Sequence, residues 1–157
     1  MSNQDNTLSQ IELERHLQFQ SLLAELSASF VRVPTNKIDQ EIEESLRRIA
    51  ENLDLDSISL GLITADGQDF YSGYRYAKPG KKPWQANSLA SEGPFLTKTL
   101  LAGKPFIMHD VEALPPEGAV DREGFLNYDT RAALIFPFIV GGHLCGAISF
   151  ASSRPQQ

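Results

Sequence analysis

Cysteine is nearly absent from this sequence, since Cys145 is the only one in 157 residues. The chain therefore cannot form an internal disulfide, which agrees with a reducing compartment. Long apolar runs are absent as well, because Pro137 and the pair Gly141-Gly142 interrupt the most apolar stretch, and a membrane-spanning helix needs about 20 apolar residues. Residues 1–7 have neither the basic nor the apolar part of a secretory signal. We therefore expect a cytoplasmic protein without a membrane-spanning segment.

Basic residues are in the minority. The chain has 14 lysines and arginines against 20 acidic residues, which gives a formal net charge of −6. Nucleic-acid-binding proteins usually have a clustered basic face, whereas the only local cluster here, Lys78, Lys81 and Lys82, surrounds a Pro-Gly turn. A short charge run of this kind is most often a solvated loop. We therefore expect no nucleic-acid partner.

Residue types for catalysis or metal binding are also sparse. The histidines His16, His109 and His143 lie far apart, and no Cys-x-x-Cys or His-x-His spacing occurs, so we expect no metal site. Asp54 and Asp56 follow a predicted helix, where turn and capping roles are typical of aspartate. No set of Ser, His and Asp with a plausible mutual placement is present. We expect no enzymatic activity.

The most apolar part of the chain is a predicted β-hairpin over residues 131–150. Two apolar arms, 132–140 and 143–150, flank Gly141-Gly142, and two glycines suit a two-residue turn because both can adopt positive φ. The arms are apolar at nearly every position, which is typical of strands covered on both faces. We expect helices on one face of this ribbon and a layer that can enclose a ligand on the other.

Helical periodicity predicts two helices before this hairpin. Over residues 8–30 apolar residues recur at helical spacing, with Leu13 and Leu17 off the main stripe. A helix with apolar residues on more than one side often has more than one packing partner. Residues 38–53 have a single apolar stripe, with acidic residues early and arginines late, which is the order that the helix dipole favours.

The remaining patterns predict an α+β fold. Strands are predicted over 57–64 and 70–77, a short helix over 95–101, a short strand over 104–108 and a weak helix over 117–128. With the hairpin, this makes five strands, which we expect in an antiparallel sheet covered on both faces. Gly61 and Gly73 lie in the middle of strands, and such glycines mark a bulge or the close approach of another group.

Several motifs follow one another along the second half of the chain: Leu101-x-Gly103-x-Pro105, Asp110-Val-x-x-Leu114-Pro115-x-Glu117, Asp121-Arg122, and the hairpin from Arg131 to Phe150. In this order they resemble a GAF domain, in particular the N-terminal GAF modules of bacterial histidine kinases, PAS-containing proteins and sigma-54-type regulators. The resemblance covers about residues 19–150. It implies a central antiparallel sheet of five to six strands, with the N-terminal helices on one face and short helices and loops forming a pocket on the other. 

The expected organisation is a single domain. It extends over residues 8–152, after a disordered tail at 1–7 and before a tail at 153–157 that leads to an output domain absent from this chain. The resemblance implies a sensory or regulatory module of bacterial signal transduction that binds a small molecule, forms a homodimer through its N-terminal helices, or does both. The alternative is a purely structural dimerisation module without a ligand.

Aromatic residues come from the elements that would surround the second face of the sheet. Aromatic walls with a few polar tips are typical of small-ligand cavities. The candidate ligand-binding residues are Tyr74, Tyr76, Trp84, Phe95, Phe106, His109, Tyr128, Arg131, Phe136 and Phe138. Aromatics at strand spacing are more often plain core, so core packing is the competing interpretation. Arg131 suits an acidic group of a ligand, but equally an ion pair with Asp121 or Asp129.

The sequence requires no cofactor and leaves haem, bilin and a small metabolite open as ligands. Cys145 lies in an apolar strand, where a thiol behaves as a small hydrophobe. GAF proteins that attach bilin have their cysteine in a different setting, and GAF-type methionine sulfoxide reductases need more than one. Residues 127–131 do not match the signature of cyclic-nucleotide-binding GAF domains, which argues against that ligand.

Overall fold

The computed structural model describes residues 2–156, apart from the side chains of residues 2–5, 23, 27, 30 and 31. Its helices are α1 (Ser2–Arg32), α2 (Ile38–Asn52), α3 (Leu89–Glu92), α4 (Pro94–Leu101) and α5 (Ala119–Asn127), with short 3-10 turns η1 (Thr35–Lys37), η2 (Val111–Ala113) and η3 (Pro116–Gly118). Its strands are β1 (Ser57–Ile63), β2 (Phe70–Ala77), β3 (Phe106–Met108), β4 (Ala132–Val140) and β5 (His143–Ser152). The predicted elements are all present, and α3 is an addition that the sequence pattern did not indicate.

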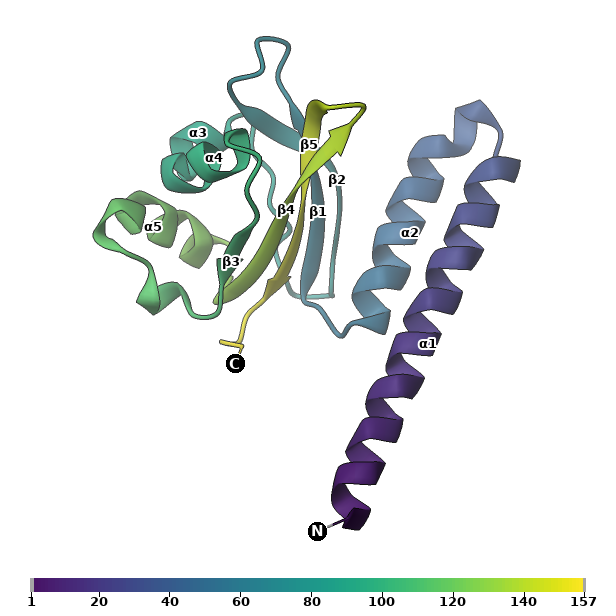
Figure 1. Ribbon diagram of the computed structural model, residues 1–157. Coiled ribbons are helices and arrows are strands. Elements are labelled where there is room, and N and C mark those ends of the chain that lie inside the picture. Colours follow the sequence, from purple (N-terminus) through teal and green to yellow (C-terminus); the bar gives the residue numbers. More distant parts are fainter. Residues whose placement is uncertain (1, 157) are drawn as a thin grey trace.

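The strands form one antiparallel sheet in the order β2-β1-β5-β4-β3 (Figure 1). The central strand β5 pairs with β1 on one side and with β4 on the other. Gly141 and Gly142 join β4 to β5 with φ angles of 56° and 80°, which confirms the predicted glycine turn, because residues with a Cβ rarely adopt such angles. The predicted α+β fold with a five-stranded antiparallel sheet is confirmed.

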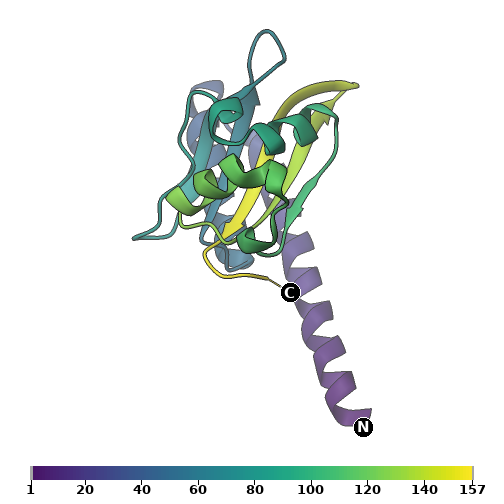
Figure 2. The same cartoon turned by 90° about the vertical axis from the view of Figure 1, so that its left-hand side faces the viewer.

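Helices lie on both sides of the sheet. On one side α2 packs against β1 and β2, where Leu46 and Ala50 contact Ile58. On the other side α3, α4 and α5 form a second layer, seen in front of the sheet in Figure 2, with Leu96 and Leu100 in the larger core cluster. The predicted division, with N-terminal helices on one face and short helices on the other, is therefore confirmed.

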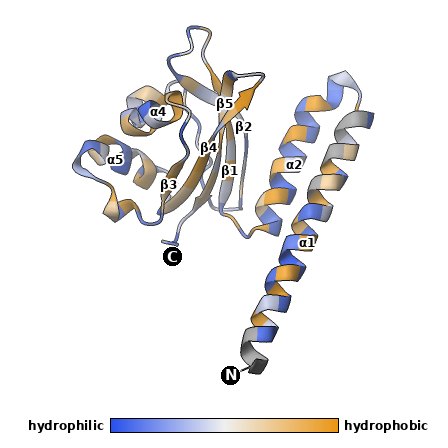
Figure 3. Ribbon diagram, in the orientation of Figure 1, coloured by the Kyte–Doolittle hydropathy of each residue, from blue (hydrophilic) through white to orange (hydrophobic). Residues whose placement is uncertain are grey.

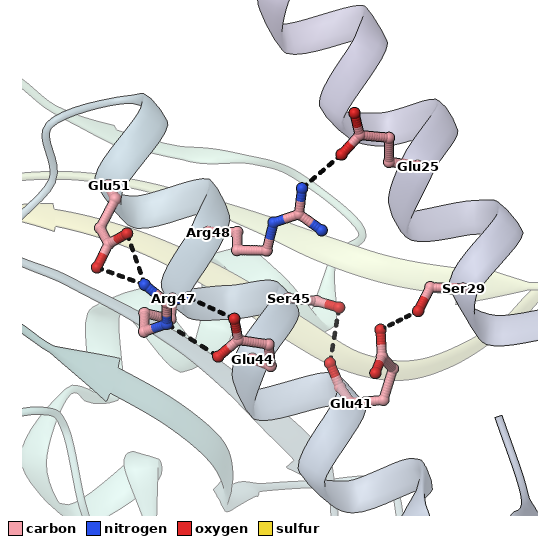
Figure 4. Close-up of polar contacts among 8 residues, drawn as sticks. All are labelled: Glu25, Ser29, Glu41, Glu44, Ser45, Arg47, Arg48 and Glu51. Atoms are coloured by element: carbon pink, nitrogen blue, oxygen red, sulfur yellow. Dashed lines mark hydrogen bonds and ion pairs between the residues drawn. The ribbon is translucent and has the colours of Figure 1, made fainter.

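The first helix packs on α2. Two polar contacts join these helices, one from Arg48 to the carboxylate of Glu25 and one from the Ser29 hydroxyl to Glu41 (Figure 4). The N-terminal part of α1 extends past the end of α2. No helix in the described part of the chain, including this long one, is apolar enough over sufficient length to cross a membrane.

The two ends of the described chain differ in secondary structure. Helix α1 begins at Ser2, so the prediction of a disordered tail is wrong for residues 2–7. Extending an existing helix adds one hydrogen bond for each residue that becomes ordered, and this outweighs the modest helix propensity of Ser, Asn and Thr. Residues 153–156 form neither helix nor strand, and the amide of Gln156 donates to the carbonyl of His109 over 2.8 Å.

The hairpin β4–β5 is strongly apolar (Figure 3), but on the α2 side only β5 is covered, where Ile148 and Phe150 pack against the α2 cluster. The prediction that both faces are covered is therefore wrong for β4. On the α2 side of the sheet, Ile107, Leu134, Phe136 and Phe138 are 41–56% exposed. The cause is geometric, because a helix is about 10–12 Å wide and strands are spaced about 4.8 Å apart. A single helix therefore covers about two strands, and α2 lies over β1 and β2.

Candidate functional site

A cavity of about 80 Å³ lies between the sheet and the layer of α3, α4 and α5. Apolar side chains from both layers, including Phe70, Leu96, Leu100 and Ile135, form much of its wall. One water occupies about 30 Å³ of the liquid. The cavity therefore has room for a few water molecules or for a ligand of only a few non-hydrogen atoms.

Small residues on two paired strands create this space. The cavity floor consists of Ser57, Ser59 and Gly61 on β1 and of their partners Ala151, Ser149 and Ala147 on β5. Directly paired residues of antiparallel strands share a face of the sheet, so these six small residues form one patch. Protein cores are close-packed, and a patch of small residues leaves an opening unless larger side chains fill it from above.

The serine hydroxyls on this floor are not used by the protein itself. Ser57 and Ser59 are 7% and 4% exposed, and Ser149 is half-buried. Within the described residues these hydroxyls make no hydrogen bond. Side-chain nitrogens and oxygens there that are completely shielded from solvent all have a hydrogen-bond partner, so the serine hydroxyls are not completely shielded. These hydroxyls therefore open onto the cavity. Buried polar groups are normally hydrogen-bonded, so a polar ligand or water is the expected partner.

The rim of the cavity is formed by Trp84, Glu92 and Tyr128. The indole Nε1 of Trp84 donates to one oxygen of Glu92 over 3.0 Å, and the hydroxyl of Tyr128 lies 3.3 Å from the other. Burial and the charge of Glu92 raise the pKa of Tyr128 above its usual value. The Trp84 ring also lies over Gly61, where a Cβ atom would be 3.4 Å from the ring. This close approach is one of the roles that the sequence suggested for mid-strand glycines.

Asp121 joins two of the helices α3, α4 and α5, which form the roof of the cavity. It is almost completely buried and accepts hydrogen bonds from the amides of Phe95 and Leu96, at 3.1 and 2.7 Å. A carboxylate at a helix N-terminus satisfies amides that lack helical partners and interacts favourably with the helix dipole. Asp121 is therefore unavailable to Arg131, whose guanidinium instead lies 3.5 Å from Glu112.

Of the aromatic candidates, Trp84 and Tyr128 line the cavity. Phe95 and Phe106 lie in the adjoining core, where Phe106 makes an edge contact with Phe95 and stacks on Phe125. They support the cavity from behind and are absent from its lining. For these two residues the competing interpretation, core packing, describes their position.

The tyrosines of β2 and the phenylalanines of β4 lie on the opposite face. Tyr74 and Tyr76 pack with the α2 core cluster, and the Tyr74 hydroxyl donates to Asp39 over 2.7 Å, which raises the pKa of Tyr74. Phe136 and Phe138 are exposed on that side, beside Leu134. Placing these four residues around the cavity was wrong. Alternation correctly put each pair on one face, but it does not say which face meets which layer.

His109 and Arg131 do not reach the cavity either. His109 borders a separate surface groove between the sheet and α1, together with Arg15, Asp54 and Arg154. Arg131 lies at the surface near Glu112, and the alternative partner Asp129 is paired with Lys81 at 3.0 Å. The ion pairs of Arg131 with Asp121 or Asp129, which were the alternative to ligand binding, are therefore not formed.

The residues that sequence reasoning missed are the floor serines and Glu92. Ser57 and Ser59 alternate with Ile58 and Leu60, which predicts a half-buried strand but not the layer that the serine face meets. The serines instead face the second helix layer. A run of small residues on two strands that pair was the available signal. It required the register of β1 against β5, which sequence alone does not provide.

The lining does not suit the larger prosthetic groups. No cysteine, histidine or methionine lines the cavity, and Cys145 lies outside it. Pockets for drug-sized ligands measure about 300–1,000 Å³, and a tetrapyrrole is larger than the 80 Å³ available here. In the described residues no group of three or more His, Cys, Asp and Glu side chains has the geometry of a metal site.

Comparison with solved structures shows which known proteins have a similar fold. Among solved structures, the phycocyanobilin-bound GAF domain of a cyanobacterial phytochrome has a TM-score of 0.70 at 12% identity, over 88% of this chain and 81% of that one. The GAF domain of the Acinetobacter phosphoenolpyruvate-protein phosphotransferase has a TM-score of 0.62 at 12% identity, over 87% and 78%. A Staphylococcus aureus NreA protein mutated in its nitrate binding site has a TM-score of 0.59 at 18% identity, over 79% and 93%. At these identities the similarity establishes the fold alone.

A search of curated proteins found no match, whereas the family model for the GAF domain matches residues 37–157. That range includes the complete sheet, α2 and the helices above the cavity. Both the family model and the antiparallel sheet between two helical layers agree with the resemblance drawn from the motifs. The chain therefore belongs to the GAF domain family.

Proposed function

We propose that this GAF domain is the sensory module of a bacterial signal-transduction protein and that it binds a small molecule in the cavity under α3, α4 and α5. The observation that supports this is the set of unpartnered serine hydroxyls on the cavity floor. A cavity kept only for packing reasons would be apolar, since genuinely empty cavities are apolar. The Staphylococcus aureus neighbour named for its nitrate binding site is consistent with a small ligand in this fold.

The module also has a surface suited to self-association, and we propose a homodimer through α1. Leu13 and Leu17 precede Leu22 and Leu26 by nine residues each, which is two and a half helical turns, or about 180° around the helix. Leu22 and Leu26 are buried, whereas Leu13 and Leu17 are 56% and 54% exposed. A second copy of α1 would cover this apolar side, and a ligand would act by binding one dimer arrangement better than another.

The cavity lining supports binding without catalysis. The serine hydroxyls have no histidine beside them in the lining, and Asp121 is held by two amides. A nucleophile needs an adjacent base within hydrogen-bond reach. We therefore propose a non-enzymatic role in the cytoplasm. In this role, ligand binding changes the arrangement of the dimer, and this change is passed to an output domain of the signalling protein.

A purely structural dimerisation module is the second candidate. The small volume of the cavity, about 80 Å³, favours it, because ordered water alone could satisfy the serine hydroxyls. The two candidates differ in one measurable property, namely whether a ligand stays with the protein.

Native mass spectrometry of protein purified from its own host tests the proposal. We expect a fraction with added mass from a small ligand. Ser149→Leu, which projects a larger side chain into the cavity, should abolish the added mass, whereas Ser149→Ala at the same position should leave the space open and reduce it only partly. Circular dichroism checks that both variants fold. Equal retention by the leucine variant would contradict binding in this cavity.

A further inference from the structure

The charged residues that line the cavity are all acidic. Its ionisable residues include the carboxylates Glu92 and Asp121, and no lysine, arginine or histidine contributes to the lining. The charge of Asp121 is directed at the first amides of α4, where it offsets the positive end of the helix dipole. Glu92 has only neutral donors, Trp84 and Tyr128, and forms no ion pair within the described residues. One negative charge at the rim is therefore uncompensated.

Aromatic rings and hydroxyl groups, both of which can interact with a cation, form part of the remaining wall beside aliphatic side chains. The rings of Phe70, Trp84, Phe125 and Tyr128 line the cavity, and aromatic faces attract cations through their quadrupole, most strongly where water is displaced. The oxygens of Ser59 and of the other floor serines can accept hydrogen bonds from N–H donors. An anion would meet the Glu92 charge and would find no cationic partner.

Together with the size of the cavity, these features define a ligand class. We infer that the cavity selects a small alkylammonium ion, a protonated amine of a few non-hydrogen atoms, held by Glu92, the aromatic rings and the serine hydroxyls. This inference rests on the proposed function, because it names the chemistry of the ligand that the sensory cavity binds. It excludes small anions as the natural ligand.

Ethylammonium, ethanol and acetate are suitable probes, because ethylammonium and ethanol have nearly the same shape and differ in charge. These probes have only a few non-hydrogen atoms and gain little total affinity, so dissociation constants on the order of millimolar are expected for them. A natural amine that fills more of the cavity binds more tightly and is the ligand expected to remain bound in native mass spectrometry. The chain has a single tryptophan, and its indole N–H resonance in an NMR titration reports directly on the rim. We expect saturable shifts with ethylammonium, about tenfold weaker binding of ethanol, and no binding of acetate.

A charge-neutral variant separates the contribution of Glu92. Glu92→Gln keeps an acceptor for Trp84 and should weaken ethylammonium about tenfold while leaving ethanol unchanged. Glu123→Gln is the matched control, since Glu123 is exposed on α5 and outside the lining, and it should change neither. If ethanol binds as tightly as ethylammonium, or acetate binds at all, the cavity is not a cation site, although it remains a ligand site.

The proposed function can fail independently of the inference that the ligand is a cation. It fails when protein from its own host retains no added mass and none of the three probes shifts the indole resonance. Absence of an ethylammonium shift overturns the inference in every case, including one in which a retained ligand is found.

Discussion

At the scale of single residues, Asp121 joins α5 to α4, two of the three helices that form the roof of the cavity. It is 1% exposed on α5 and accepts hydrogen bonds from Phe95 and Leu96 at the start of α4. Asp121→Ala removes both acceptors and leaves a buried amide unpaired. We expect it to lower the free energy of unfolding by about 2–3 kcal/mol, as measured by urea denaturation.

Asp110 provides a matched control for this variant. It is half-buried and accepts an exposed hydrogen bond from the amide of Glu112 at the start of η2. Asp110→Ala should therefore cost only about 0.5–1 kcal/mol, as is usual for an exposed cap. Equal losses in the two variants would mean that burial of Asp121 adds nothing to its role.

Asp69 makes stability depend on pH at the acidic end. Burial opposes its ionisation, but hydrogen bonds from the Ser88 hydroxyl and from the amides of Ala90 and Phe70 outweigh it, so the pKa of Asp69 lies below its usual value. A carboxyl group whose pKa is lowered by folding stabilises the protein above its unfolded pKa of about 3.9. That contribution is lost as the pH falls through the folded pKa.

The measurement is the free energy of unfolding between pH 6 and pH 3 for the parent protein and Asp69→Asn. We expect a smaller decrease with falling pH in the variant, because asparagine does not titrate. The exposed Asp129, whose carboxylate pairs with Lys81, offers Asp129→Asn as a control with little change in slope, since exposed ion pairs contribute little. An unchanged slope in Asp69→Asn would show that Asp69 is not a source of the acid sensitivity.

At the scale of elements, β4 has two faces of opposite character. Ile135 is 5% exposed and lies in the large core cluster, whereas Phe138 is 49% exposed on the α2 side. We expect Ile135→Ala to cost about 2–4 kcal/mol, because it leaves a cavity in the packed core. Phe138→Ala should cost less than about 1 kcal/mol, although it deletes more atoms.

Urea denaturation of both variants tests the assignment of the faces. A larger loss for the phenylalanine variant would place the core on the other side of β4. If the domain is a dimer that covers this face, the loss for Phe138→Ala should increase with protein concentration, which separates the two causes.

At the scale of the whole molecule, α1 provides the proposed link to a second copy. Leu17→Glu places a charge on the exposed apolar side of α1, and Gln18→Glu places the same charge on the next residue, about 100° around the helix. Sedimentation velocity should show a dimer for the parent and for Gln18→Glu, and a monomer for Leu17→Glu. A parent protein that stays monomeric at high concentration contradicts dimerisation through α1.

The arrangement of layers also separates two tasks. The sheet lies between the helices α3, α4 and α5 on one side and the helix pair α1–α2 on the other (Figure 1). The cavity is on the first of these sides. Strand β1 contributes to both, because Ser57 and Ser59 face the cavity while Ile58 contacts Leu46 and Ala50. A ligand that shifts β1 would therefore act directly on the packing of α2.

Much of the fold was predictable because local patterns determine local structure. The single stripe of residues 38–53 became α2, and the glycine turn at Gly141-Gly142 became the β4–β5 hairpin. The site was less predictable. Tyr74 and Phe136 were assigned to the cavity from their chemistry and their alternation, and both lie on the other face. Period-2 alternation places residues on common faces without identifying the layer that each face meets.

The sequence by itself determined the element types, the antiparallel α+β class and the family, because periodicity, turn residues and motif order act over short distances along the chain. Only the tertiary structure decided which strands pair, that α2 lies mainly over β1 and β2, and that small residues of β1 and β5 meet to form the cavity floor. These features depend on contacts between residues far apart in sequence. Ser59 and Ser149 become neighbours only when β1 and β5 pair, and no local sequence pattern predicts that pairing.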